Sequence, residues 1–160
     1  MANFIIRDAR TSEKDVIAAL WHSLMQEHCA IDPRFQVAED AVKKYSRHLH
    51  EMIRTKNGRV LVAEVRESGL LVGFIMGEIQ SRPPISLPGI YGFISDLYVC
   101  PECRRHGIAR SLFLEMSRWF QSRKANAIEL YAAETNPDAV AFWHSMGLKP
   151  FLRLHRLDLT

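Results

Sequence analysis

Two cysteines and several basic residues lie close together in the stretch CPECRRHGIARSLF, which runs from Cys100 to Phe113. Thiols two residues apart, here Cys100 and Cys103, are typical of metal sites and of redox pairs. The segment from Arg104 to Arg110 instead combines a glycine with arginines, a pattern typical of a backbone turn that binds phosphate. The two interpretations predict different chemistry, and the surrounding elements decide between them.

The metal and redox interpretations lack partners in this chain. A structural zinc site needs four ligands, and the sequence has only one closely spaced cysteine pair. His28 and Cys29 lie on or just after the first long helix, and nothing in the spacing brings them near Cys100. A redox pair would open a helix, whereas Gly107 and the apolar spacing after it place the helix start later. The sequence therefore predicts no metal site.

The phosphate interpretation accounts for more of the residues. A strand that ends at Val99, a turn at Gly107 and a helix that begins at Ile108 direct several free N–H groups toward one point. The helix dipole stabilises an anion there by about 0.3–1 kcal/mol, and by ~2 kcal/mol in a partly buried site. The alternative is that Gly107 only makes a tight turn and the arginines form a solvated rim.

The elements around this turn alternate between strands and helices. Short β-rich runs predict strands at Asn3–Arg7, Arg59–Arg66, Leu70–Gln80, Ile90–Val99, Ala127–Ala133 and Phe151–Leu159. Helical spacing predicts helices around Val16–Met25 and Ala41–Ile53, after Gly107, and from Asn136 to Gly147. The order is β-α-α-β-β-β-α-β-α-β, an α/β (α+β) arrangement in which helices pack on a mixed sheet. No repeat or linker divides the chain, so we expect a single domain over residues 1–160.

Local signals fix several ends of these elements. Ser12 and Asp15 have the spacing of a capping box at the start of the first helix. Asn136 before Pro137 predicts a helix N-cap with proline at the first helical position, and Gly147 predicts the end of that helix. Three prolines make the segment Ser81–Gly89 a loop.

The stretch VCPECRRHGIARSLF, preceded by ISDLY and followed by NPDAVAFWHSMGL, resembles the GNAT superfamily of acyl-CoA N-acyltransferases. The superfamily motif (Q/R)-x-x-G-x-(G/A) is matched by Arg104, Gly107 and Ala109. A second motif, N-x-x-A-x-x-F-(Y)-x-x-x-G, is matched by Asn136, Ala139, Phe142 and Gly147. The resemblance covers essentially the whole chain and implies a mostly antiparallel central sheet flanked by helices.

The resemblance also implies a binding site for acetyl-CoA. Backbone amides from Arg105 through Arg110 would hold the diphosphate of the coenzyme, and the strand end at Leu97–Val99 would pair with its pantetheine arm. The residues that the resemblance assigns to the coenzyme are Leu97, Tyr98, Val99, Arg104, Arg105, His106, Gly107, Ile108, Ala109, Arg110, Asn136, Ala139, Phe142 and Trp143. Cys100 and Cys103 then become residues of the turn.

An acyl transfer of this type requires a neutral amine. A lysine-like amine is neutral at pH 7 in only about one molecule in 2,500, which is a deficit of roughly 4.6 kcal/mol. A positioned base typically contributes 10²–10⁴-fold. Asp96 is the first candidate for this base and Glu78 on the neighbouring strand is the second. The alternatives are a buried Asp96 that caps backbone or pairs with an arginine, and a solvated Glu78.

The sequence departs from the superfamily pattern at Trp143, where many members have a tyrosine that acts as general acid. An indole N–H cannot donate a proton and take it back as a phenol does. The coenzyme thiol has a pKa near 8.5 and leaves without strong assistance, so the departure is tolerable. Tyr131 is a candidate replacement, Tyr98 and His144 are others, and packing or surface positions are the alternative interpretation for Tyr131, His144 and Trp143.

The resemblance implies that the acceptor pocket is formed by the first two helices, their connection and the loop before the strand that begins at Ile90. Its candidate residues are Trp21, Glu27, His28, Asp32, Phe35, Tyr45 and Tyr91, of which we expect Trp21, Glu27, His28 and Tyr91 to bind substrate. Mixed aromatic and acidic groups suit an amine-bearing molecule. Surface helices also carry such residues, so an ordinary surface remains the alternative.

The composition sets the remaining expectations. The chain has 160 residues, of which 48% are hydrophobic, and a formal charge of +3 that is scattered along the sequence. We therefore expect no nucleic-acid partner and no membrane span. Three cysteines and the absence of a signal-peptide pattern favour a cytoplasmic protein with reduced thiols. A homodimer is compatible with the fold, and no interface can be read from the sequence.

Three functions remain open from the sequence. The leading hypothesis is an acetyl-CoA-dependent N-acetyltransferase that transfers the acetyl group directly to a primary amine of a small molecule or peptide. The second is a non-catalytic acyl-CoA-binding module, which Trp143 in place of tyrosine would favour. The third is a zinc protein built on Cys100 and Cys103.

Overall fold

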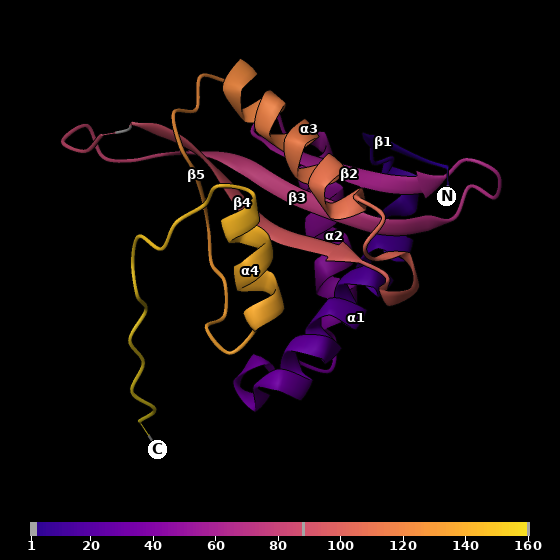
Figure 1. Ribbon diagram of the computed structural model, residues 1–160, viewed down its shortest axis with the longest axis horizontal. Coiled ribbons are helices and arrows are strands. Elements are labelled where there is room, and N and C mark those ends of the chain that lie inside the picture. Colours follow the sequence, from indigo (N-terminus) through magenta and orange to yellow (C-terminus); the bar gives the residue numbers. More distant parts are fainter. Residues whose placement is uncertain (1–2, 88, 160) are drawn as a thin grey trace.

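A computed structural model describes residues 3–87 and 89–159 of the chain (Figure 1). Its centre is a five-stranded sheet whose strands follow the order β1-β2-β3-β4-β5. The strands are β1 (Phe4–Asp8), β2 (Gly58–Val65), β3 (Leu71–Ser81), β4 (Ile90–Val99) and β5 (Ile128–Leu130). The first four pair antiparallel, and β5 pairs parallel to β4. The expected mixed, mostly antiparallel sheet is confirmed.

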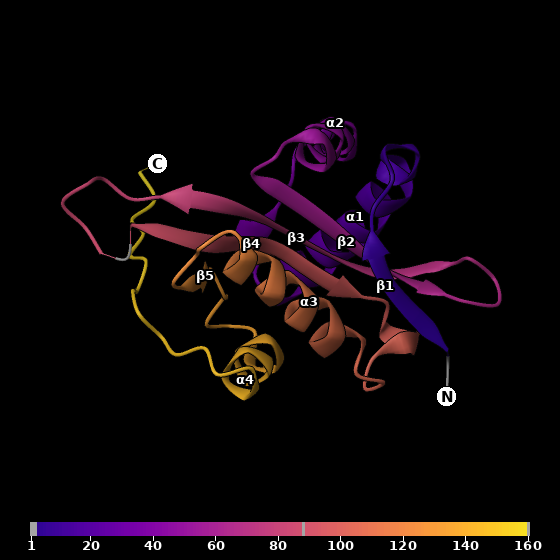
Figure 2. The same ribbon diagram turned by 90° about the horizontal axis from the view of Figure 1, so that it is seen from above.

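Four α-helices cover the two faces of this sheet (Figure 2). They are α1 (Lys14–Ile31), α2 (Ala41–Arg54), α3 (Ile108–Ser122) and α4 (Pro137–Ser145). The helices α1 and α2 lie on one face, and α3 and α4 lie on the other. Each face has its own apolar core, one around Leu49 and Phe74 and the other around Leu112 and Ile75.

The first helix begins differently from the sequence prediction. The capping box expected at Ser12 and Asp15 is absent, and a short 3₁₀ turn from Thr11 to Glu13 comes first. There the Glu13 carboxylate accepts a hydrogen bond from the backbone N–H of Arg10, at 2.8 Å. Asp15 instead accepts a bond from the Ser46 hydroxyl on α2, at 2.5 Å. The prediction was wrong by two residues because a second acidic residue with cap spacing precedes Asp15.

The start and end of α4 follow the sequence prediction. The Asn136 side chain accepts a hydrogen bond from the backbone N–H of Ala139 at 3.1 Å, and Pro137 occupies the first turn. The helix ends before Gly147, which has a φ of +91°. The N–H of Leu148 then bonds to the carbonyl of Trp143 at 3.0 Å. This pattern closes the last turn of the helix.

Strand β4 carries a bulge that decides which of its side chains share a face. Met76 of β3 lies opposite Asp96, but the next residue, Gly77, lies opposite Ile94, so Ser95 is the extra residue. Ile94 and Leu97 therefore pack on the same core, beside α3. Tyr98 packs on the opposite core, beside α1 and α2, and alternation places Asp96 on that face.

Helix α3 lies unusually close to the sheet at one position. A Cβ atom built on Gly77 would lie 2.8 Å from Cζ of Phe120, and one built on Gly92 would overlap the same ring. Both glycines lie on adjacent strands, so their bare backbones form a flat seat for this phenylalanine. Phe120 is fully buried there. The seat fixes the last turns of α3 on β3 and β4.

Two predicted strands differ from the structure. The strand expected at Ala127–Ala133 is shortened to Ile128–Leu130 because the chain leaves β4 after three paired residues. The strand expected at Phe151–Leu159 is absent, since this segment has no strand partner among the described residues. The loop expected at Ser81–Gly89 is present from Arg82 on, and its residue 88 lies outside the described part of the chain.

No described helix combines the length and apolar composition needed to cross a membrane.

Candidate coenzyme and acceptor site

The turn before α3 presents backbone N–H groups that the chain does not use. The amides from Arg105 through Arg110 have no hydrogen-bond acceptor among the described residues, and the first helical bond is donated by Ser111 to Gly107. Gly107 has a φ of +79°, and a Cβ atom added to it would meet no atom within 4 Å. The space beside Gly107 is therefore open, and unpaired amides in such a turn have the chemistry to hold an anionic group such as a diphosphate.

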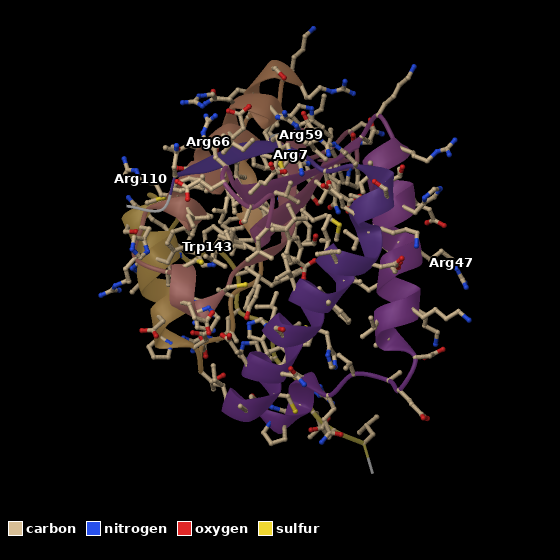
Figure 3. The ribbon with its side chains drawn as sticks, turned by 90° about the vertical axis from the view of Figure 1, so that its right-hand side faces the viewer. Arg7, Arg47, Arg59, Arg66, Arg110 and Trp143 are labelled. Carbon is tan, nitrogen blue, oxygen red and sulfur yellow. The ribbon has the colours of Figure 1, made fainter. Side chains whose placement is uncertain are left out.

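Arginines and a buried strand end hold this turn in place. The Arg104 guanidinium donates to the carbonyl of Val99 at 2.9 Å and to both carboxylate oxygens of Glu27 at 2.7 and 2.8 Å. Glu27 also accepts a bond from the Tyr98 hydroxyl at 3.2 Å. The C-terminal part of α1 is thus tied to the turn. Arg110 lies on the same side of the molecule as Trp143, opposite Arg47 of α2 (Figure 3).

The sheet opens beside the second half of β4. β4 pairs with β5 only from Gly92 to Ile94. From Ser95 to Val99 its outer edge has no strand partner in the described part of the chain. Unpaired strand edges bind extended chains through their backbone groups. The open edge leads directly to the turn at Gly107, so a ligand held at the turn can extend along β4.

Asp96 lies next to this open edge, on the face of the sheet that α1 and α2 cover. Its Oδ2 accepts a hydrogen bond from the Tyr45 hydroxyl of α2, at 3.0 Å. The Tyr45 ring stacks on Trp21 of α1, with centroids 4.1 Å apart and an interplanar angle of 8°. Asp96 is only partly buried, so its carboxylate is not sealed in the core.

The surroundings of Asp96 change its proton affinity. Burial raises the pKa of the carboxyl group above its ordinary value, while the hydroxyls of Tyr45 and Ser95 act in the opposite direction. Burial also raises the pKa of the Tyr45 hydroxyl well above its ordinary value, so this group remains a donor. His28 and His48 lie within electrostatic range of Asp96, and burial lowers the pKa of His28. A carboxylate with raised proton affinity in a partly open site is suited to accept a proton.

The two cysteines of the opening motif do not form a pair. Cys100 packs against the core beside α1 and α2, whereas Cys103 packs against the core beside α3. Burial raises the pKa of the Cys100 thiol, which disfavours the thiolate that metals and disulfide exchange require. Among the described residues, no group of three or more His, Cys, Asp or Glu side chains has a geometry that could hold a metal ion.

Most of the sequence matches a protein family. A profile described as the acetyltransferase (GNAT) family matches residues 20–148. The chain belongs to this family. Membership makes the chain an acyltransferase, and acetyl-CoA is the acyl donor that GNAT acetyltransferases use. The open turn at Gly107 and the free edge of β4 fit the diphosphate and the extended arm of this donor.

Solved structures with the same fold include acetyltransferases. A mutant of BH1408 from Bacillus halodurans has a TM-score of 0.87 and 23% identity, covering 98% of this chain and 99% of that chain. The aminoglycoside N-acetyltransferase AAC(6')-Iy in complex with CoA has a TM-score of 0.77 and 14% identity, covering 99% and 96%. AAC(6')-IG from Acinetobacter haemolyticus has a TM-score of 0.76 and 16% identity, covering 98% of each chain. These likenesses show the fold, and no curated protein sequence matches the chain.

The residues expected to bind substrate do not all meet in this GNAT structure. Trp21 and His28 lie near Asp96. Glu27 is instead engaged by Arg104. Tyr91 lies toward the far end of β4, where its hydroxyl donates to Gln80 at 2.6 Å and its ring lies 4.4 Å below the Arg82 guanidinium. The contact of Glu27 with Arg104, and those of Tyr91 with Gln80 and Arg82, give both residues a structural role.

The other catalytic candidates have weaker positions than Asp96. Glu78 accepts a bond from Gln80 at 2.7 Å and has no contact with Asp96 or α2 in the interactions described. Tyr131 follows β5 where the sheet opens, and its ring meets Phe93 edge-on at 5.5 Å while 83% of the residue is exposed. It therefore lies at the surface, directly after β5. Trp143 packs edge-on against Phe113 at 5.9 Å, between α4 and α3.

Sequence reasoning placed Tyr45 in the pocket but missed its bond to Asp96. Tyr45 and Asp96 are 51 positions apart, and no local motif connects them. A tyrosine on the apolar face of a helix was the only available signal, and such residues usually serve packing alone. His48, one helical turn after Tyr45, was missed for the same reason.

Proposed function

We propose that the chain is an N-acetyltransferase that transfers the acetyl group of acetyl-CoA directly to a primary amine of a small molecule or peptide. The observation that carries this proposal is the Asp96 carboxylate, which Tyr45 fixes near the C-terminal end of β4, the end that leads to the free amides at Gly107. A donor site and a proton acceptor therefore flank the same open strand edge.

Each part of the site has a separate task. When bound, acetyl-CoA supplies an acetyl group that is activated as a thioester. The amides from Arg105 through Arg110 bind the diphosphate, with Asn136, Ala139 and Phe142 proposed to line the opposite side of the cleft. The outer edge of β4, at Leu97–Val99, orients the extended arm by backbone hydrogen bonds. These contacts position the acyl group without contributing to proton transfer.

Asp96 prepares the acceptor amine. An alkylammonium group with a pKa near 10.4 must lose a proton before attack, and Asp96 accepts it directly or through a water. The raised pKa of Asp96 makes the transfer less unfavourable than it would be to an exposed carboxylate. Its negative charge also attracts the ammonium form of the acceptor. Direct transfer needs no nucleophile from the protein.

The arrangement of the cysteines supports a cytoplasmic location. All three cysteines are free in the structure, and the two in the turn pack on different cores. We propose the cytoplasm as the compartment, since free thiols persist in reducing conditions. The scattered charge gives no basis for a nucleic-acid partner.

The experiment measures thiol release from acetyl-CoA with a panel of polyamines, aminoglycosides, amino acids and peptides, together with coenzyme binding by calorimetry. We expect binding, and turnover with at least one class of amine. The variant Asp96→Asn should keep coenzyme affinity and lose about 10²–10⁴-fold in turnover. Binding without turnover across the panel would instead favour the non-catalytic module, and no binding would refute both.

A further inference from the structure

A hollow of about 310 Å³ lies between helix α1, the first half of α2 and the connection between them. The two helices lie next to each other on one face of the sheet (Figure 2). A dry apolar cavity of about 150 Å³ holds benzene, so this α1–α2 hollow has room for an aromatic ring. Three of its lining residues carry aromatic rings and two are alanines; the full set is Trp21, Ala38, Ala41, Lys44, Tyr45 and His48.

Tyr45 connects the α1–α2 hollow to the proposed proton acceptor. Its side chain forms part of the wall, and its hydroxyl donates a hydrogen bond to Asp96 at 3.0 Å. Asp96 therefore lies about one tyrosine side chain away from the hollow. The stack of Tyr45 on Trp21, with ring centroids 4.1 Å apart, holds this wall in one arrangement. A ligand that fills the hollow can thus place an amine at Asp96 through a short linker.

The charges around the hollow suit a ligand with one ammonium group. None of the six described lining residues is acidic. Asp40, at the start of α2, is already paired with Lys44 at 3.0 Å, and Glu39 is exposed and is not among the lining residues. A polyamine or aminoglycoside would bring a second ammonium group next to the Lys44 amine, where like charges repel each other. Only the ammonium group at Asp96 would have a carboxylate.

The aromatic residues of the hollow favour a flat ring over a saturated chain. Trp21 is only partly buried, so part of its indole remains available for contact. The imidazole of His48 meets Tyr45 edge-on, with ring centroids 6.1 Å apart. Aromatic rings prefer offset-stacked and edge-to-face contacts, and these walls offer both kinds of surface. A ring in the hollow would also bury more apolar area than a short alkyl chain.

We propose that the acceptor is a monoamine with an aromatic ring on a short linker, whose ring occupies the α1–α2 hollow while its ammonium group lies at Asp96. The simplest such molecule is 2-phenylethylamine. This inference rests on the proposed function, which supplies the acetyl group. The amine nitrogen forms a bond to the acetyl carbon as the carbon–sulfur bond breaks. Asp96 receives the first proton of the ammonium group, and the departing thiolate takes the second.

The test compares kcat/KM for 2-phenylethylamine, propylamine and spermidine with acetyl-CoA as the donor. We expect 2-phenylethylamine to exceed propylamine by about 10–100-fold, which corresponds to the burial of one ring. Spermidine should be the poorest of the three substrates. Equal values for 2-phenylethylamine and propylamine, or a preference for spermidine, would overturn the inference and leave the proposed function in place.

The variant Ala41→Leu tests whether the ring binds in the hollow. Ala41 is the first residue of α2, and leucine is a good helix former that would fill part of the space. The preference for 2-phenylethylamine over propylamine should fall by about 10-fold. The matched control is Ala19→Leu, at an exposed position of α1 that does not line the hollow, and it should keep the wild-type preference. An unchanged preference in Ala41→Leu overturns the proposal.

Calorimetry separates a failure of this inference from a failure of the proposed function. It measures the binding of 2-phenylethylamine and of propylamine to the wild-type protein in the presence of coenzyme A. Tighter binding of 2-phenylethylamine without any turnover would support the ring site and contradict the acyl transfer. No binding of 2-phenylethylamine would overturn the inference, whichever amines are acetylated.

Discussion

The Tyr45 hydroxyl donates a hydrogen bond to Oδ2 of Asp96 at 3.0 Å and joins helix α2 to strand β4. The bond fixes one oxygen of a carboxylate that would otherwise rotate. Stacking on Trp21 holds the tyrosine ring in turn. Burial favours the protonated acid, and the hydroxyl favours the carboxylate, so the two effects together set the pH at which Asp96 can accept a proton.

The variant Tyr45→Phe should shift the pH dependence of the reaction. Loss of the hydroxyl removes a group that lowers the pKa of Asp96, so this pKa should rise further. A base works only when ionised, and the acidic limb of kcat/KM should therefore move to higher pH. A hydrogen bond to a charged group contributes about 1.5–3 kcal/mol, which corresponds to about 1–2 pH units. The measurement is the pH profile of kcat/KM with one fixed amine.

Tyr91→Phe is the matched control for that experiment. It removes a phenolic hydroxyl from the same sheet, but the Tyr91 hydroxyl donates to Gln80 and not to Asp96. Its profile should coincide with that of the wild type. If Tyr45→Phe and Tyr91→Phe gave the same profile, Asp96 would not be the group that titrates in the acidic limb.

Asp96→Asn should stabilise the fold near neutral pH although it lowers turnover. The folded state raises the pKa of Asp96, so the acid is protonated in both states below its ordinary value near 3.9. As the pH rises above that value, the unfolded chain loses the proton first, and the folded state becomes relatively less stable until the pH exceeds the folded pKa. Asparagine is neutral throughout. The difference in melting temperature between variant and wild type should therefore grow from acidic to neutral pH, and a constant difference would contradict the raised pKa.

Gly107→Val should abolish coenzyme binding and leave the fold intact. Its Cβ would meet no protein atom within 4 Å, but a branched side chain in the middle of the turn would crowd the diphosphate proposed to bind there. Its φ of +79° also costs a branched residue about 1–2 kcal/mol. Gly69→Val is the control, because Gly69 has a φ of +70° and equally open surroundings in the hairpin turn between β2 and β3. The melting temperature should fall by a similar amount in both variants. Only Gly107→Val should lose coenzyme binding, measured by calorimetry.

Trp143→Tyr should not increase turnover. The indole packs against Phe113 of α3 and Phe142, with ring centroids 5.9 and 4.9 Å away. Its role in the structure is therefore the contact between α4 and α3, where a smaller ring loses packing. We expect turnover within about three-fold of the wild type. The melting temperature should be lower, because the free energy of unfolding should fall by about 1 kcal/mol. A large gain in rate would show that the missing phenol limits the reaction.

Local sequence signals predicted the features that depend on a few neighbouring residues. Asn136 with Pro137 predicted the start of α4, and Gly107 predicted the turn before α3, because caps and turns need particular residues at fixed spacings. The helix start at Ser12 failed by the same logic, since Glu13 supplied an equally good cap for an earlier turn. The sequence alone does not show which of two neighbouring acidic residues caps the start of the helix.

Features that depend on distant residues were less accessible. The bulge at Ser95 decides the face of Asp96, and it arises from the register between β3 and β4. The bond from Tyr45 depends on how α2 lies across the sheet. The missing strand at Phe151–Leu159 has the right alternation but pairs with no strand in the described part of the chain. In each case the pattern was present, and the partner was set by tertiary structure.

The packing of Phe120 on Gly77 and Gly92 affects the position of the whole of α3, including its N-terminal end. The helix packs on the sheet through Ile108, Leu112, Phe113, Met116 and Phe120, and its first residue, twelve before Phe120, lies beside the open amides. Twelve residues of helix span about 18 Å, so a small rotation at the seat becomes a displacement of an ångström or more at the amides. Even an added methyl group at Gly92 would thus weaken coenzyme affinity from a position that never touches the coenzyme.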